Sequence, residues 1–115
     1  MVRVASLAAL VLALPLALAG CADMREPITI SEGIVTVDNH SDHEWRNVVV
    51  TVNDHFRGGA ARLAPGGRLT APLSQFQTGH GQRFSLSRQT VFKVEVTATD
   101  DRGEAVALQW GQTRR

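Results

Sequence analysis

Polar and apolar residues alternate along much of the chain after residue 27. This period-two pattern, in runs rich in valine and threonine, is typical of antiparallel strands with one buried face and one wetter face. No window keeps the apolar stripe that an amphipathic helix would need over three turns. The pattern predicts four clear strands, at 33–38, 45–52, 90–99 and 104–110, and three weaker ones, at 60–63, 68–73 and 83–86.

Turn-forming residues separate these runs. Residues 38–42 are polar, 58–59 and 65–67 contain paired glycines that allow tight turns, and 100–103 (Asp-Asp-Arg-Gly) read as a hairpin loop. Seven short strands at this spacing predict an all-β fold, a small immunoglobulin-like antiparallel β-sandwich that occupies residues 28–115. A ligand-holding barrel would need more chain.

The inward-facing positions of these strands predict the hydrophobic core. The first core residue is either Ile34 or Val35, because the pattern of the first strand does not decide which of the two faces inward. Truncating a buried phenylalanine such as Phe92 to alanine would then cost about 3–5 kcal/mol. The other predicted core residues are Val48, Val50, Val52, Leu63, Leu73, Phe76, Phe84, Val94, Val96, Leu108 and Trp110.

The first twenty residues have a different pattern. Arg3 is their only charge, and an apolar run interrupted by Ser6 and Pro15 follows it up to Ala19. A basic start, an apolar centre and a small-residue end predict a secretory signal peptide over residues 1–20. A transmembrane helix is the competing interpretation, but the run is shorter than the roughly 18–20 apolar residues that cross a bilayer.

The end of this segment, Leu18-Ala19-Gly20-Cys21, resembles the lipobox of bacterial lipoproteins. The resemblance implies that a diacylglyceryl group is attached to the Cys21 thiol, that the leader is cut before Cys21, and that the new amino group is acylated. Two or three acyl chains give a stable membrane anchor, whereas one gives reversible binding. The alternative is a soluble secreted protein in which Cys21 is a free thiol.

The residues after the cysteine bear on the location. Residues 21–27 have no periodicity and predict a short lipidated tether. In enteric bacteria an aspartate directly after the lipidated cysteine is associated with retention in the inner membrane. Here Ala22 holds that place and Asp23 comes one position later. The resemblance therefore implies a bacterial envelope protein at the outer membrane, facing the periplasm.

A second resemblance concerns the folded part. The run N-H-S-D-x-x-W-R-N-V-V-V-T-V-N, followed by L-A-P-G-G-R-L-T, resembles small immunoglobulin-like modules of bacterial envelope proteins. Asn39 and Ser41 form a polar "N-x-S" turn, and Leu63, Pro65 and Gly66 form an "L-x-P-G" turn. The resemblance supports the fold, implies an interaction domain and carries no catalytic residues.

Candidate chemistry is sparse. Metal binding would use His40 and His43, which share a loop with Asp42 and Glu44, or His80, but a loop H-x-x-H has no fixed ligand geometry. No serine stands in a G-x-S-x-G setting, so we expect no enzyme and no cofactor. Without Arg3 the basic and acidic residues balance at 11 each, which argues against a nucleic-acid binder.

Trp45 has two interpretations. It can fill the core as the first inward residue of its strand, or it can stand at the rim as a contact residue, since exposed tryptophan is enriched in binding hot spots. Trp45 and Val48 have opposite parity, so a regular strand cannot bury both. The leading hypothesis is a lipid-anchored, non-enzymatic module that binds another envelope protein. The rival is a small periplasmic metal- or ligand-binding protein that uses the 40–44 loop.

Overall fold

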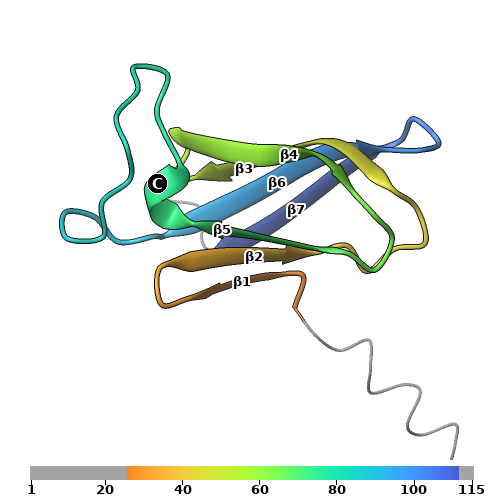
Figure 1. Ribbon diagram of the computed structural model, residues 1–115, viewed down its shortest axis with the longest axis horizontal. Helices are drawn as coiled ribbons and strands as arrows, with labels where there is room; N and C mark the ends of the chain where they lie inside the picture. Colours follow the sequence, from red (N-terminus) through yellow and green to blue (C-terminus); the bar gives the residue numbers. More distant parts are fainter. Residues whose placement is uncertain (1–25, 112–115) are drawn as a thin grey trace, which may run out of the picture.

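The computed structural model describes residues 26–111. The fold is an antiparallel β-sandwich (Figure 1), as the alternating pattern predicts. Within the described range, no helix is long and apolar enough to cross a membrane. The elements are β1 (Ile28–Ser31), β2 (Ile34–Asp38), β3 (Trp45–Val52), β4 (Phe56–Leu63), β5 (Arg68–Pro72), the 3₁₀ turn η1 (Leu73–Gln75), β6 (Lys93–Asp100) and β7 (Ala105–Gly111).

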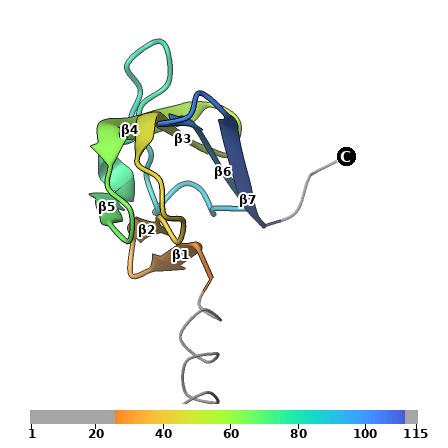
Figure 2. The same cartoon turned by 90° about the vertical axis from the view of Figure 1, so that its right-hand side faces the viewer.

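The two sheets face each other (Figure 2) and differ in size. One has the order β1-β2-β5 and the other has the order β4-β3-β6-β7. The immunoglobulin constant arrangement places strands 3, 6 and 7 in one sheet and strand 4 in the other. Here a short turn after β3 keeps β4 beside it, so the fourth strand joins the sheet of β3, β6 and β7.

The core lies between the sheets and contains most of the predicted residues. Val35 is buried, whereas Ile34 is 37% exposed, which decides the register of β2. Leu108 and Trp110 are half-buried and pack against the core. The prediction that Phe92 is a buried core residue is wrong, because Phe92 precedes β6, is only half-buried and lines a surface depression.

A bulge in β3 resolves the parity conflict between Trp45 and Val48. Asn47 has a φ of 52°, and the register of β3 against β6 shifts between Arg46 and Val49. The extra residue lets Trp45 and Val48 both face the core, where each is at most 5% exposed. Asparagine tolerates this left-handed conformation better than other residues with a side chain do.

One strand was not predicted, and two local predictions are wrong. The alternation in 28–31 is too short to predict β1, and residues 83–86 form no strand beyond a single bridge from Arg83 to Gln77. Residues 58–59 lie inside β4 instead of forming a turn. A Cβ on Gly59 would meet the Val48 carbonyl oxygen at 2.0 Å, so glycine is needed there for close approach of two backbones.

Candidate functional site

The sandwich has two ends, and the chain enters at one of them. The Pro27 carbonyl accepts a hydrogen bond from the Asp38 amide at 2.8 Å, so residues 26–27 lie beside the end of β2. We call this the tether end, with the loops 39–44, 64–67 and 101–104. The far end has the turns at 32–33 and 53–55 and the connection 73–92. The lipidation candidate Cys21 and the predicted signal peptide lie outside the described residues.

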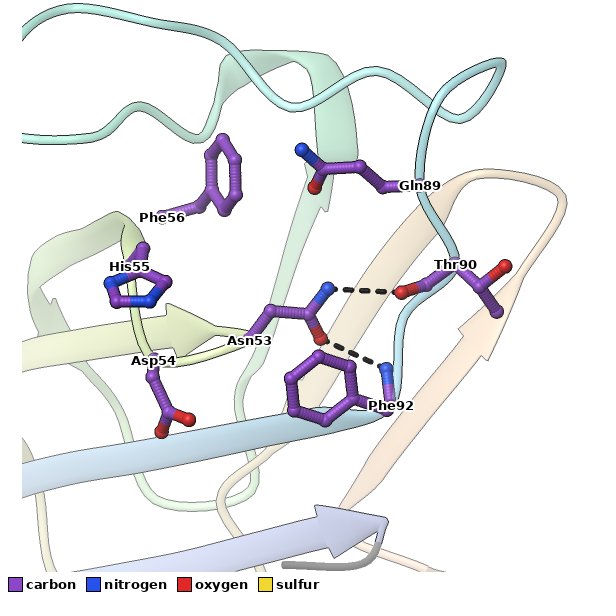
Figure 3. A pocket seen from close by; sticks show the side chains of 7 residues that line it. All are labelled: Asn53, Asp54, His55, Phe56, Gln89, Thr90 and Phe92. Carbon is purple, nitrogen blue, oxygen red and sulfur yellow. Dashed lines mark hydrogen bonds between the residues drawn. The ribbon is translucent and has the colours of Figure 1, made fainter. Parts of the chain in front are cut away.

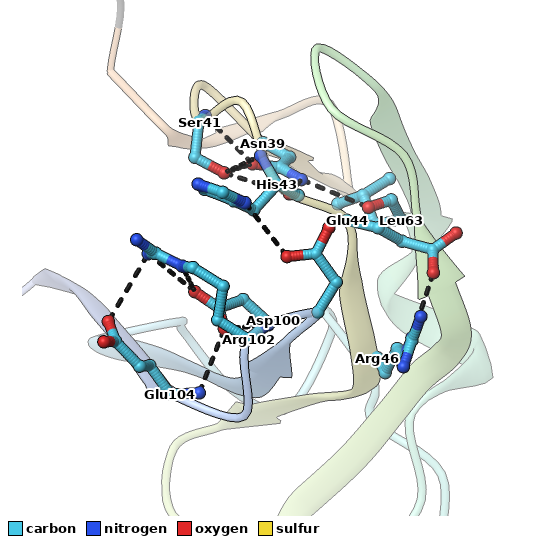
Figure 4. Close-up of polar contacts among 10 residues, drawn as sticks. Asn39, Ser41, His43, Glu44, Arg46, Leu63, Asp100, Arg102 and Glu104 are labelled. Atoms are coloured by element: carbon cyan, nitrogen blue, oxygen red, sulfur yellow. Dashed lines mark hydrogen bonds and ion pairs between the residues drawn. The ribbon is translucent and has the colours of Figure 1, made fainter.

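One buried side chain organises the tether end (Figure 4). Asn39 is fully buried, and its Nδ2 donates to the carbonyl oxygens of His43 at 2.8 Å, Leu63 at 3.1 Å and Ala64 at 3.1 Å. Its Oδ1 accepts from the Ser41 amide at 3.0 Å and the Ser41 hydroxyl at 2.7 Å. Asn39 therefore joins the loop after β2 to the turn after β4.

This geometry explains the two motifs of the immunoglobulin-like resemblance. The "N-x-S" turn and the "L-x-P-G" turn are far apart in sequence but bind each other through side chain and backbone. The Asn39 carbonyl accepts from the Gly66 amide at 2.8 Å, and the Asn39 amide donates to the Gly67 carbonyl at 2.9 Å. Gly66 has a φ of 72°, which favours glycine. The motif residues therefore hold the fold together.

Ion pairs cover the same end. Asp100 is 6% exposed and accepts hydrogen bonds from the Glu104 and Arg102 amides, each at 2.9 Å, while Arg102 Nη2 lies 2.9 Å from Asp100 Oδ2. The Glu104 amide, assisted by the Arg102 side chain and amide, lowers the pKa of Asp100 from 3.8 to about 2. Asp38 pairs with Arg68 at 2.7 Å. Asp100 therefore stays ionised near neutral pH and holds the 101–104 loop in place.

The metal candidates are not brought together. His43 Nδ1 lies 2.9 Å from Asp101 Oδ1, and His40 is exposed in the same loop. His80 is exposed in the hairpin at 78–82, at the other end of the sandwich. In residues 26–111 no three histidine, cysteine, aspartate or glutamate side chains gather to hold a metal ion.

Trp45 belongs to the core. Only 5% of the residue is exposed, and it lies in β3 opposite Leu63 and Asp100. The packing interpretation is confirmed. The possible role as a partner contact is wrong for this fold, since a contact residue needs an exposed ring.

The far end carries an open depression of about 640 Å³ (Figure 3). Beneath it lies Asn53, which is buried and has a φ of 51°. Asn53 Nδ2 donates to the Thr90 carbonyl at 2.9 Å, and Oδ1 accepts from the Phe92 amide at 2.9 Å. The rim offers amide, hydroxyl, imidazole and phenyl groups for hydrogen bonding and stacking. The lining residues are Asn53, Asp54, His55, Phe56, Gln89, Thr90 and Phe92.

The pattern of polar and apolar residues did not indicate this depression. Residues 53–55 (Asn-Asp-His) form a turn. The turn-forming Asn-Asp pair between the Val-rich run and Phe56 was the sequence signal that could have indicated it. Lys93 closes one side of the turn through an ion pair to Asp54 at 2.6 Å. The hydrogen bond that Lys93 Nζ donates to the Asp54 carboxylate raises the pKa of Lys93, so its ammonium group stays charged.

The connection 73–92 is attached to the sandwich by aromatic side chains. Phe76 and Phe84 are buried, and the Phe84 ring packs edge-on against Phe56 with centroids 5.2 Å apart. The Phe84 amide also donates to the Phe76 carbonyl at 3.0 Å. Between them the 78–82 hairpin projects from the sandwich (Figure 1).

No family model, curated protein or solved structure matches this chain. The interpretation of its function therefore depends on its own residues.

Proposed function

We propose that this chain is a bacterial lipoprotein, anchored through Cys21 to the periplasmic face of the outer membrane, whose β-sandwich is a non-enzymatic interaction module. The proposal is carried by one observation. The lipobox-like Leu18–Cys21 segment stands seven residues before Ile28, where β1 begins. Even fully extended, such a tether reaches only about 25 Å.

The place where the chain enters the fold supports an orientation. A lipid on Cys21 keeps the tether end next to the bilayer, and the far end points away from it. The far end carries the depression above Asn53 and the projecting hairpin at 78–82. A partner in the periplasm would meet these surfaces and the sides of the sheets.

The polar residues of the 39–44 loop, which were candidates for chemistry in the sequence, also support a binding module. Asn39 and Ser41 hold two loops together, and His43 pairs with Asp101. Their hydrogen-bonding groups are used within the protein, in a way that makes a rigid support for other surfaces.

The test is a Cys21→Ala variant expressed in a Gram-negative host with an alkyne-labelled fatty acid. We expect the wild type to carry the label and to begin at Cys21 by mass spectrometry. The variant should lose the label, keep its leader and leave the outer-membrane fraction. Asp23→Asn is the matched control, because it alters the tether and spares the cysteine. A labelled variant, or a wild type with a bare thiol, would refute the proposal.

A further inference from the structure

The edges of the two sheets differ in how they are protected. An edge strand offers main-chain groups to other chains, and proteins protect it by shortness, charge, proline or cover. β1 has four residues, and β5 has five and ends at Pro72. β4 carries Arg57 and Arg62, and Arg57 pairs with Gln77 of the long connection. β7 has seven residues (AVALQWG), with no charge and no proline.

The inner face of β7 is also incompletely covered. Val106, Leu108 and Trp110 point toward the core but are only half-buried, whereas Val94 and Val96 of the neighbouring β6 are fully buried. β1 of the other sheet lies nearest to β7 across the sandwich (Figure 2), and Cα atoms of the two strands approach within 8 Å. The half-buried apolar row of β7 therefore lies at a sheet edge to which no described strand is hydrogen-bonded.

We propose that β7 is the interaction surface, and that it accepts an extended segment of a different envelope polypeptide as an added strand. This inference rests on the proposed function. The fitting segment carries apolar side chains at alternate positions, aligned with Val106 and Leu108, because these would cover the open row. Uncharged side chains fit between them, since Ala105 and Ala107 leave no charge to pair with.

The tether makes a second copy of this chain a poor occupant of the edge. β7 runs from the tether end, where Ala105 pairs with Thr99, to the far end, where Gly111 pairs with Lys93. Two copies related by a two-fold axis would pair their β7 strands antiparallel. One tether would then start at the membrane-distal end and would have to run back along the whole domain. A strand of seven residues alone spans about 23 Å, which already uses nearly the full reach of the tether.

The experiment maps the register of the added strand. A photo-crosslinking amino acid is placed at Ala105 or Ala107 in the full-length, acylated protein in cells, with Thr70 of β5 as the control edge position. We expect crosslinks from both β7 positions to one polypeptide and at most a tenth as much from Thr70. Moving the probe by two residues should move the crosslinked residue of the partner by about two. That ladder is the signature of strand addition.

A matched pair of substitutions tests the same edge. Leu108→Lys and Leu69→Lys both place a charge at a half-buried leucine of an edge strand, in β7 and β5 respectively. An inward-pointing charge blocks pairing at an edge. We expect Leu108→Lys to lower the crosslink from Ala105 at least tenfold and Leu69→Lys to change it less than twofold. Circular dichroism of both purified variants checks that they fold. If Leu108→Lys does not fold, the crosslinking ladder from Ala105 and Ala107 alone decides the test.

The remaining outcomes overturn the inference. Crosslinks from β7 to a second copy of this chain, no crosslink above the Thr70 level, or crosslinked partner residues without the two-residue step would each refute strand addition. Fatty-acid labelling of the same samples separates the two proposals. An acylated protein without the ladder leaves the lipoprotein proposal intact, and a ladder on an unacylated protein removes only the anchor.

Discussion

At the tether end, short loops converge on the side chain of Asn39 and are covered by ion pairs, whereas at the far end the 73–92 connection is anchored by Phe76 and Phe84. Asn53 adds hydrogen bonds at the far end but lies under an open depression. One end is closed by directional polar contacts and the other is attached by apolar burial.

The two ends therefore differ in how freely their residues can be substituted. Hydrogen bonds from one buried amide fix the positions of several carbonyls at once, so the tether end has little freedom. Two buried rings hold the ends of the 76–84 segment and leave the residues between them on the surface. Substitutions of these surface residues should therefore cost little stability.

The sharpest test of the apolar anchor compares two phenylalanines. Phe84→Ala removes a buried ring that packs on Phe56 and should lower the free energy of unfolding by about 3–5 kcal/mol. Phe92→Ala removes a half-buried ring and should cost about half as much or less. Urea denaturation of both variants measures this, and equal losses would mean that the long connection is not held through Phe84.

The two buried asparagines test the polar contacts. Asn39→Ala removes the three hydrogen bonds that its Nδ2 donates to the carbonyls of His43, Leu63 and Ala64, and it should cost about 3 kcal/mol. Asn53→Ala should cost about 2 kcal/mol, since its Nδ2 donates only one hydrogen bond, to the Thr90 carbonyl, and its Oδ1 accepts from the Phe92 and Lys93 amides. Thermal melting ranks the pair. A smaller loss for Asn39→Ala than for Asn53→Ala would contradict the contrast between the ends.

Acid should weaken the tether end through Asp100. Its pKa is lowered from 3.8 to about 2 in the fold, chiefly by the Glu104 amide, so the stabilisation is complete above about pH 5 and is lost as the pH falls through about 2. The difference in unfolding free energy between wild type and Asp100→Asn, measured from pH 6 to pH 2, should shrink as the pH falls. A constant difference would show that the ionised carboxylate does not stabilise the loop.

The smallest expected effect compares two turns. Gly66 at the tether end has a φ of 72°, and Gly66→Ala should cost about 1 kcal/mol. Gly79 lies at the tip of the far-end hairpin, where an added Cβ would meet no heavy atom within 4 Å and the φ is not left-handed. Gly79→Ala should therefore change stability by less than about 0.5 kcal/mol. Differential scanning calorimetry measures the stability of both variants. Equal losses of stability would contradict the predicted difference between the two turns.

Local sequence signals predicted much of the fold but misread several positions. Period-two alternation predicted five of the strands well, because burial on one face depends on neighbouring residues. The glycines at 58–59 misled the prediction because a glycine pair signals positive φ and close backbone approach equally well. Asn47 gave no sign that it would take a left-handed conformation and turn Trp45 inward.

The candidate surfaces were less predictable. Asn39 and Ser41 were recognised as a turn, but the Asn39 partners Leu63 and Ala64 lie more than twenty residues away and become neighbours only when the sheets close. The exposed edge of β7 depends on strand order, which alternation does not encode.

The sequence by itself determined the all-β class, most of the strand positions and most of the core, because these follow from which side chains must leave water. Tertiary structure alone decided which strands became edges, which loops met at Asn39 and where the depression above Asn53 opened. These features depend on contacts between segments far apart in the chain, and no local pattern specifies them.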